Sequence, residues 1–144
     1  MAIRTCKIEA EEVIATLEAE PALTFATCAG NRVTIRPMSH VNDGLDVYFQ
    51  TGSDSLKMRQ IRENPNVALY VGTYEMEGAA VEAGHPLAEE NALFIQAYKE
   101  KHPGSYERYS GLEDEIVVKV TVGLVRQWRY VKREPVLAEI DLGG

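Results

Sequence analysis

Hydrophobic residues recur with two different periods in this sequence. In residues 22–28, ALTFATC, they alternate with polar or small ones, which is typical of a strand with one buried face. In residues 8–20, IEAEEVIATLEAE, they follow the spacing of an amphipathic helix, and Pro21 ends that helix. The chain therefore predicts short helices combined with strands.

Short turns join several of the predicted strands. Ala29-Gly30-Asn31 and Asn42-Asp43-Gly44 carry residues that hairpin turns favour, and strands joined by such turns are antiparallel. The predicted strands cover residues 22–28, 32–41, 45–51, 66–74, 78–83 and 115–131. The predicted helices cover residues 8–20, 53–64 and the segment from His85-Pro86 to a stop at Pro103-Gly104. Because barrel closure removes exposed edges, we expect a mostly β protein with flanking helices, built on a six-stranded antiparallel barrel.

Composition and net charge narrow the class of protein. A chain of 144 residues, 45% of them hydrophobic, is long enough for one domain, residues 1–144, with its own core. Its net charge of −7 argues against nucleic acid as the main partner. No apolar run approaches the roughly 18 residues of a membrane span, and the first residues lack the hydrophobic region of a signal peptide. We therefore expect a soluble cytoplasmic protein.

Residue types that bind metals are sparse. Two cysteines are too few for a disulfide framework or a zinc site, and the three histidines lack the spacing of metal ligands. Without an export signal both cysteines are expected to be reduced. We predict no metal site.

The charge is distributed unevenly along the chain. Residues 32–62 contain five basic residues and three acidic ones, whereas residues 126–133 contain four basic residues and no acidic one. Two basic segments in or beside strands of an acidic protein suit the binding of a small anion. A solvated surface with a local fluctuation of charge is the alternative, and charge alone does not decide between the two.

The segment QTGSDSLKMRQIRENP (50–65) places cations where a helix disfavours them. The helix predicted over residues 53–64 follows a glycine-serine turn and ends before a proline. Lys57 and Arg59 then lie in its first two turns, beside the partial positive charge at the amino end of a helix. A bound anion at this end explains why two cations are tolerated.

A second irregularity lies in the strand TIRPMSHV (34–41). Pro37 interrupts this strand, and proline belongs there only at an edge, at a bulge or where a ligand replaces the neighbouring strand. If pairing is counted outward from the Asn42-Asp43-Gly44 turn, Arg36 lies opposite Gln50.

Hydroxyl groups and cations then converge at one end of the sheet. The converging side chains belong to Arg36, Thr51, Ser55 and Lys57. Together with free backbone N–H groups at a helix start, these groups suit a phosphate. The sequence contains neither the glycine-rich P-loop nor the Rossmann glycine fingerprint, so a nucleotide loop of those types is not indicated.

Four motifs occur in order within residues 22–72. ALTFATCAGNRVTIRPMSHV contains an R-x-x strand, and DVYFQTGSDSLKMRQIRENPNVALYV contains an aromatic-x-T turn, an S-x-K helix start and an N-P-x-V-A strand. This set resembles the FMN-binding split β-barrel family related to pyridoxamine 5′-phosphate oxidase. The resemblance implies a six-stranded antiparallel split β-barrel, with FMN bound in a groove between the two subunits of a homodimer.

The resemblance also implies roles for individual residues. By position, Arg36 and Lys57 hold the FMN phosphate, and Thr51 and Ser55 assist them. The residues expected to border the flavin ring or the ribityl chain are Pro37, Met38, Ser39, Gln50 and, from the late strand of either subunit, Trp128. Other roles stay open, because Thr51 and Ser55 also suit a helix cap and Trp128 also suits a core or a dimer interface.

The chain departs from true pyridoxamine-phosphate oxidases in three respects. Leu56 and Val41 stand where the family motif has basic residues, and residues 85–112 contain no substrate segment rich in arginine and serine. A pocket for pyridoxal phosphate is therefore not expected. The loss of a basic residue also leaves room for weaker flavin binding or for another phosphate-bearing cofactor.

We interpret the chain as an FMN-dependent oxidoreductase that acts on an unidentified small molecule. Flavin supplies the hydride or electron transfer, and the protein supplies orientation and electrostatics. No residue presents itself as an obligatory acid or base, so no catalytic side chain is predicted. Two alternatives stay open: a relative that binds deazaflavin or haem, and a non-enzymatic flavin-binding or sensor protein.

Overall fold

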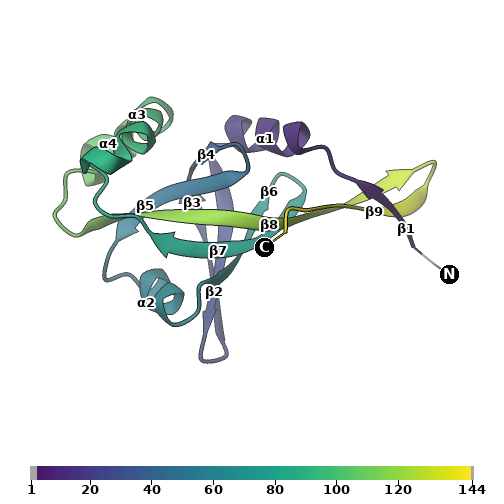
Figure 1. The fold of residues 1–144 in the computed structure, drawn as a ribbon, viewed down its shortest axis with the longest axis horizontal. Helices are drawn as coiled ribbons and strands as arrows, with labels where there is room; N and C mark the ends of the chain where they lie inside the picture. The colour runs from purple at the N-terminus through teal and green to yellow at the C-terminus, as the bar shows by residue number, and fades with distance from the viewer. Residues whose placement is uncertain (1–2, 144) are drawn as a thin grey trace.

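Nine strands form one sheet in residues 3–143, the part of the chain that the computed structural model describes (Figure 1). The strands are β1 (Arg4–Lys7), β2 (Ala22–Ala29), β3 (Arg32–Ser39), β4 (Val41–Asp43), β5 (Asp46–Gly52), β6 (Asn66–Val71), β7 (Tyr74–Glu82), β8 (Glu115–Val131) and β9 (Glu134–Asp141). The helices are α1 (Ala10–Ala19), α2 (Leu56–Glu63), α3 (Ala92–Lys101) and α4 (Pro103–Tyr109), with a 3-10 turn η1 (Glu89–Asn91) before α3. Helices α1, α3 and α4 lie on one side of the β5–β8 pair, and α2 lies on the other (Figure 1).

The strand order shows an open sheet rather than a closed barrel. Neighbouring strands follow the order β1-β9-β8-β7-β6-β2-β3, and β5 pairs with both β4 and β8. All pairs are antiparallel except β1 with β9, which is parallel. Within the described residues β3 pairs only with β2 and forms an edge. The predicted class, mostly β with flanking helices, is confirmed; the six-stranded barrel is not, because nine strands form a mixed sheet that does not close.

The extra strands have local causes. The predicted strand 32–41 becomes β3 and β4, because the fully buried His40 leaves the ladder and its carbonyl accepts a hydrogen bond from His102 Nε2 (2.8 Å). Strand β1 was not predicted because all four of its residues are exposed, so no hydrophobic period marks it. Helix α3 ends at Lys101, before Pro103, as predicted, and Pro103 then occupies the first turn of a further helix, α4, a position that proline favours.

Strand β8 connects the parts of the sheet. It pairs with β5 through residues 115–120, with β7 through residues 118–126 and with β9 through residues 124–131. The register against β7 shifts at Gly78, where an added Cβ would lie 2.5 Å from the Thr121 carbonyl oxygen. Glycine is therefore required at this close approach of two backbones. The last part of β8 extends with β9 and β1 away from the other strands (Figure 1).

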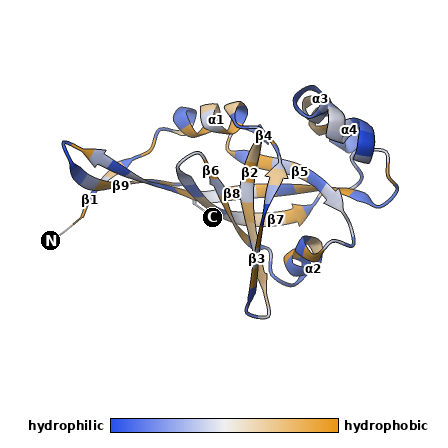
Figure 2. Ribbon diagram, turned by 180° about the vertical axis from the view of Figure 1, so that it is seen from behind, coloured by the Kyte–Doolittle hydropathy of each residue, from blue (hydrophilic) through white to orange (hydrophobic). Residues whose placement is uncertain are grey.

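The core lies between the strands and helices α1 and α2. Its largest side chains are Phe25 and Phe49, both fully buried, with ring centroids 4.8 Å apart in an edge-to-face arrangement. Figure 2 shows that hydrophobic residues concentrate on the central strands. A smaller cluster under α3 contains Val41, Phe94, Tyr98 and Val117. No helix in residues 3–143 is long and apolar enough to cross a membrane.

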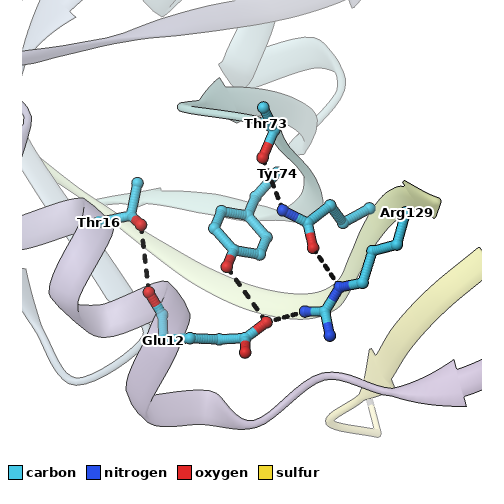
Figure 3. Close-up of polar contacts among 6 residues, drawn as sticks. Glu12, Thr16, Thr73, Tyr74 and Arg129 are labelled. Atoms are coloured by element: carbon cyan, nitrogen blue, oxygen red, sulfur yellow. Dashed lines mark hydrogen bonds and ion pairs between the residues drawn. The ribbon is translucent and has the colours of Figure 1, made fainter. Parts of the chain in front are cut away.

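A polar network fixes α1 to the sheet (Figure 3). The Glu12 carboxylate of α1 accepts hydrogen bonds from the Tyr74 hydroxyl (3.1 Å) and from the Arg129 guanidinium. Arg129 also donates to the Gln127 side chain, whose amide in turn donates to the Thr73 hydroxyl (2.6 Å). Arg129 therefore has a structural partner, and the basic segment 126–133 is not a free anion-binding surface at this residue.

Candidate functional site

Lys57 lies in the first turn of α2, as the sequence predicted. The helix begins at Leu56 rather than at Ser53, with Ser55 as its N-cap, so Lys57 is the second helical residue. Lys57 Nζ donates a hydrogen bond to Thr51 Oγ1 at the end of β5 (2.7 Å). In the described part of the chain no carboxylate lies within 4.0 Å of this ammonium group. A half-buried cation with no carboxylate in direct contact therefore stands at the positive end of a helix dipole.

The electrostatics of Lys57 reflect this position. Burial lowers its pKa, the nearby Arg36 guanidinium lowers it further, and Glu115 opposes both. Arg36 itself has a lowered pKa because it is partly desolvated. The two cations are close enough to repel each other, so a bound anion between them would relieve both the repulsion and the desolvation.

The strand pairing that places Arg36 at this site differs from the predicted one. Arg36 lies opposite Phe25 of β2, not opposite Gln50, because the ladder counted outward from the Asn42-Asp43-Gly44 turn ends at Val41. Its Nη1 donates to Thr27 Oγ1 (2.9 Å), and its Nη2 donates to Thr34 Oγ1. The guanidinium is thus oriented by β2 and β3.

A buried glutamine of α2 locks this part of the sheet against the helix. Gln60 Oε1 accepts hydrogen bonds from the hydroxyls of Thr27 (2.5 Å) and Thr34 (2.6 Å), and its Nε2 donates to the Arg32 carbonyl (3.0 Å). These contacts hold Arg36 and Lys57 on neighbouring elements. The sequence-based hypothesis did not include Thr27, Thr34 or Gln60.

Ser55 provides a test of whether an anion fits. Its Oγ is buried and has no hydrogen-bond partner within the described residues, and it does not cap the helix through its side chain. A buried hydroxyl without a partner is costly, and a phosphate oxygen is an acceptor that it could satisfy. We call the place where β3, β5 and α2 meet the cationic corner. Its donors are the Ser55 hydroxyl, the Lys57 ammonium and the Arg36 guanidinium, and this set fits a phosphate group.

Gln50 lies at the same corner, but its side chain already has protein partners. Its Nε2 donates to Glu115 Oε2 (3.0 Å), and its Oε1 accepts from the Ser110 hydroxyl (2.8 Å). All three residues are buried. Glu115, at the start of β8, lies opposite Gly52 in the sheet. The sequence-based hypothesis missed Glu115 and Ser110, which are more than fifty positions away from Gln50.

The three residues predicted to border the flavin ring lie at the carboxyl end of β3. Pro37 is exposed and lies on the edge strand β3, opposite Thr24 of β2. An edge strand is one of the positions that proline tolerates. Met38 is partly buried and packs against the main core, whereas Ser39 ends the strand. They continue the strand from Arg36, so they lie beside the cationic corner.

Trp128 is not part of this corner within one chain. It lies on β8 opposite Leu137 of β9 and is 49% exposed. Gln50 pairs with Val117, eleven positions earlier on β8, which corresponds to roughly 35 Å along an extended strand. A contact between Trp128 and a cofactor at the corner therefore requires the Trp128 of a second subunit.

Other candidate groups have structural contacts. His40 is fully buried and its Nε2 contacts the Leu17 carbonyl oxygen (2.8 Å). Arg126 contacts Glu77 (2.8 Å) and Glu139 (4.0 Å). Within residues 3–143 no cluster of three His, Cys, Asp or Glu residues could hold a metal ion.

Comparison with known proteins identifies the class. The sequence profile of the pyridoxamine 5′-phosphate oxidase family matches residues 10–129, which is most of the chain. The chain belongs to this family. Comparison with the sequences of curated proteins gives no match.

Solved structures support the same fold. An FAD-binding protein of Mesorhizobium loti is 18% identical with a TM-score of 0.66, and the match covers 87% of this chain and 96% of that one. The heme storage protein of Vibrio cholerae is 14% identical with a TM-score of 0.68, covering 81% and 90%. An F420 reductase is 19% identical with a TM-score of 0.60, covering 77% and 93%. At these identities the likeness shows the fold alone.

Proposed function

We propose that the protein is an FMN-dependent oxidoreductase that binds the FMN phosphate at the corner between β3, β5 and α2. The observation that carries this proposal is the pair of partly desolvated cations, Arg36 and Lys57, beside the unpartnered hydroxyl of Ser55. Family membership supports a cofactor at this place, and a structural neighbour is an FAD-binding protein.

The residues at the corner would share the binding of the cofactor. Lys57 and Arg36 would pair with the phosphate oxygens, and Ser55 would donate its hydroxyl. Thr51 orients the ammonium group of Lys57, and Thr27 and Thr34 orient the guanidinium of Arg36. The residues from Pro37 to Ser39 would border the flavin ring beyond the phosphate. When bound, FMN supplies hydride or electron transfer to or from a small molecule.

The proposal includes a homodimer. A groove of ≈ 500 Å³ runs over β2, β3, β6 and β7, and its lining includes Val33, Ile35, Leu69 and Met76. Val33 and Ile35 on the edge strand are 69% and 68% exposed, which is unusual for neighbouring branched aliphatic residues. A second copy of the chain would cover this face and bring its own Trp128 within reach of the cofactor.

Substitution of Ile35 by Asp tests the dimer. Covering an unpaired carboxylate is costly, so we expect Ile35→Asp to raise the dimer dissociation constant by roughly a hundredfold or more. Light scattering after size exclusion, over a range of protein concentrations, measures the change. Val81→Asp is the matched control, because Val81 is 54% exposed on β7 but does not line the groove. A wild-type protein that is monomeric at micromolar concentrations would contradict the dimer.

The absorption spectrum tests the cofactor. The purified protein, or the protein after incubation with FMN and removal of free ligand, is expected to absorb in the flavin region in near-stoichiometric amount. Reduction of the bound flavin by NADH or NADPH, followed by reoxidation with added acceptors, tests turnover. A protein that stays colourless with excess FMN would overturn the proposal, whereas tight binding without turnover would indicate a sensor or storage role.

Deazaflavin and haem are the second candidates, because two neighbours with this fold are an F420 reductase and a heme storage protein. Parallel titrations with FMN, reduced deazaflavin and haem, followed by quenching of Trp128 fluorescence, rank the three ligands. The sequence offers one tryptophan, so the signal has a single origin. The cofactor is the ligand that binds saturably with a dissociation constant at least tenfold below the dissociation constants of the other two ligands.

A further inference from the structure

The buried carboxyl group of Glu115 lies near the proposed phosphate site and forms no ion pair with a basic side chain of the described residues. Glu115 is only 8% exposed, and its Oε2 accepts one hydrogen bond, from Gln50 Nε2 (3.0 Å). Among the described residues no basic group lies within 4.0 Å of the carboxylate. Carboxylates buried to this degree are rarely left without a paired charge.

The charged neighbours of Glu115 come from helix α2 and from the loops that follow β7 and precede β8. Burial raises its pKa and Asp114 raises it further, whereas the hydrogen bond from Gln50 and the attraction of Lys57 and His85 act in the opposite direction and only partly compensate. Burial raises the pKa of Tyr98 on α3, and the charge of Glu115 contributes to that rise. Lys57 is the only one of these groups that belongs to the proposed phosphate site.

Consecutive residues of β5 hold Lys57 and Glu115, because Lys57 Nζ donates to Thr51 Oγ1 (2.7 Å) and Glu115 Oε2 accepts from Gln50 Nε2 (3.0 Å). Without the anion, the carboxylate of Glu115 is the negative group that partly compensates Lys57. With the anion, Lys57 is engaged elsewhere, and a second negative charge stands near Glu115. Both changes favour the protonated form of a buried carboxyl. Glu115 also lines an open hollow of ≈ 620 Å³ with Asp114 and His85, so it can exchange protons with solvent.

We propose that Glu115 takes up a proton when the phosphate-bearing cofactor binds, so that it acts as a replaceable counter-ion for Lys57. This inference rests on the proposed function, because it requires an anion at the Arg36–Lys57 corner. It gives the site a specific property: the affinity for the phosphate depends on the protonation of a side chain that does not touch it. Glu115 is thus a positioning residue for the charge of Lys57, not a direct ligand.

The sign of the effect follows from the linkage between protons and ligand. Binding raises the pKa of Glu115, so affinity for FMN is highest below the pKa of the free protein and falls as pH rises toward the pKa of the complex. Each unit by which binding raises that pKa changes the limiting affinity about tenfold. Above both pKa values the carboxylate stays charged in the complex and the affinity is lowest.

The test compares wild-type protein with Glu115→Gln across pH. The substitution keeps an acceptor for Gln50 Nε2 but removes the charge, so the fold is retained. FMN dissociation constants are measured by Trp128 quenching and by calorimetry from about pH 5 to about pH 8.5, in buffers that differ in ionisation enthalpy so that proton uptake is counted directly. Glu113→Gln is the matched control, since Glu113 is exposed and lines the same hollow.

We expect the two proteins to bind FMN equally well at low pH and Glu115→Gln to bind about tenfold more tightly at high pH. Titration of the FMN phosphate contributes equally to both proteins and cancels in the comparison. Glu113→Gln should follow the wild-type curve. If FMN binds but wild type and Glu115→Gln show the same pH profile and proton uptake, the role of Glu115 is wrong while the proposed function stands. If wild type binds no FMN at any pH, the proposed function fails, and this inference fails with it.

Discussion

Replacing Lys57 with Ala is expected to weaken FMN binding by about 1.5–3 kcal/mol, roughly tenfold to more than a hundredfold in dissociation constant. This is the range for a hydrogen bond to a charged group, and Lys57 is a half-buried cation at the corner. Titration of apo-protein with FMN, followed by fluorescence, measures the change.

The same substitution should not destabilise the apo-protein. Lys57 has a lowered pKa in the folded chain, chiefly through burial and then through Arg36. A lysine whose folded pKa is depressed makes an unfavourable contribution to folding at neutral pH, which is relieved only as pH rises through that pKa. Its place at the amino end of α2 adds to the cost. We therefore expect the midpoint of thermal unfolding of apo Lys57→Ala to equal or exceed that of wild type.

Arg59→Ala is the matched control for Lys57→Ala. Arg59 lies two positions further along α2, is exposed, and loses the same formal charge on substitution. It should change FMN affinity by less than about threefold, because an exposed charge at this distance is screened by salt. A fall of several degrees in the unfolding midpoint of apo Lys57→Ala, with little change in FMN affinity, would show that Lys57 is structural.

The features that the sequence predicted correctly depend on residues close together in the chain. Lys57 and Thr51 are six positions apart, and the end of a strand followed by a turn and a helix brings them together. The hairpin at Gly44 was also predicted, but its turn is Gly44-Leu45, with Asp43 paired to Asp46, so Asn42 and Asp43 belong to β4. Local turn chemistry and hydrophobic period are sufficient for such features.

Register could not be extrapolated through a strand that breaks. The pairing of Arg36 with Gln50 assumed a continuous ladder from Asp43, but His40 leaves the ladder and β3 pairs with β2 instead. Arg36 still comes near Lys57, because Gln60 of α2 contacts Thr27 and Thr34 of the same hairpin. The expected neighbours were brought together by a different strand pairing.

The polar partners of the corner were missed for two different reasons. Thr27 and Thr34 lie symmetrically about the Gly30-Asn31 turn, so the hairpin register alone places them opposite each other and could have revealed the pair. Gln50 and Glu115 are 65 positions apart and meet only because β5 pairs with the start of β8. No local pattern in the sequence specifies which strand becomes the neighbour of β5.

Stability is expected to fall steeply in mild acid because of His40. This side chain is fully buried, and burial lowers its pKa from 6.5 to about 4, with Lys101 and His102 as further positive neighbours. The unfolded chain binds the proton more readily than the folded chain, so the stability of the neutral form is fully present above about pH 6.5 and is lost as pH falls toward 4. The slope is about 1.4 kcal/mol per pH unit and the total loss is about 3 kcal/mol.

Substitution of His40 by Gln isolates this contribution from the titration of carboxyl groups. The amide of Gln can reproduce the hydrogen bond that His40 Nε2 makes with the Leu17 carbonyl oxygen, but it does not titrate. Urea unfolding at intervals between pH 7 and pH 4 should therefore show a gentler loss of stability for His40→Gln, with a difference in slope of about 1 kcal/mol per pH unit. His85→Gln, which leaves His40 in place, should retain the wild-type slope. Parallel curves for wild type and His40→Gln would mean that the buried imidazole is accommodated in its charged form, and that the acid sensitivity of the fold originates elsewhere.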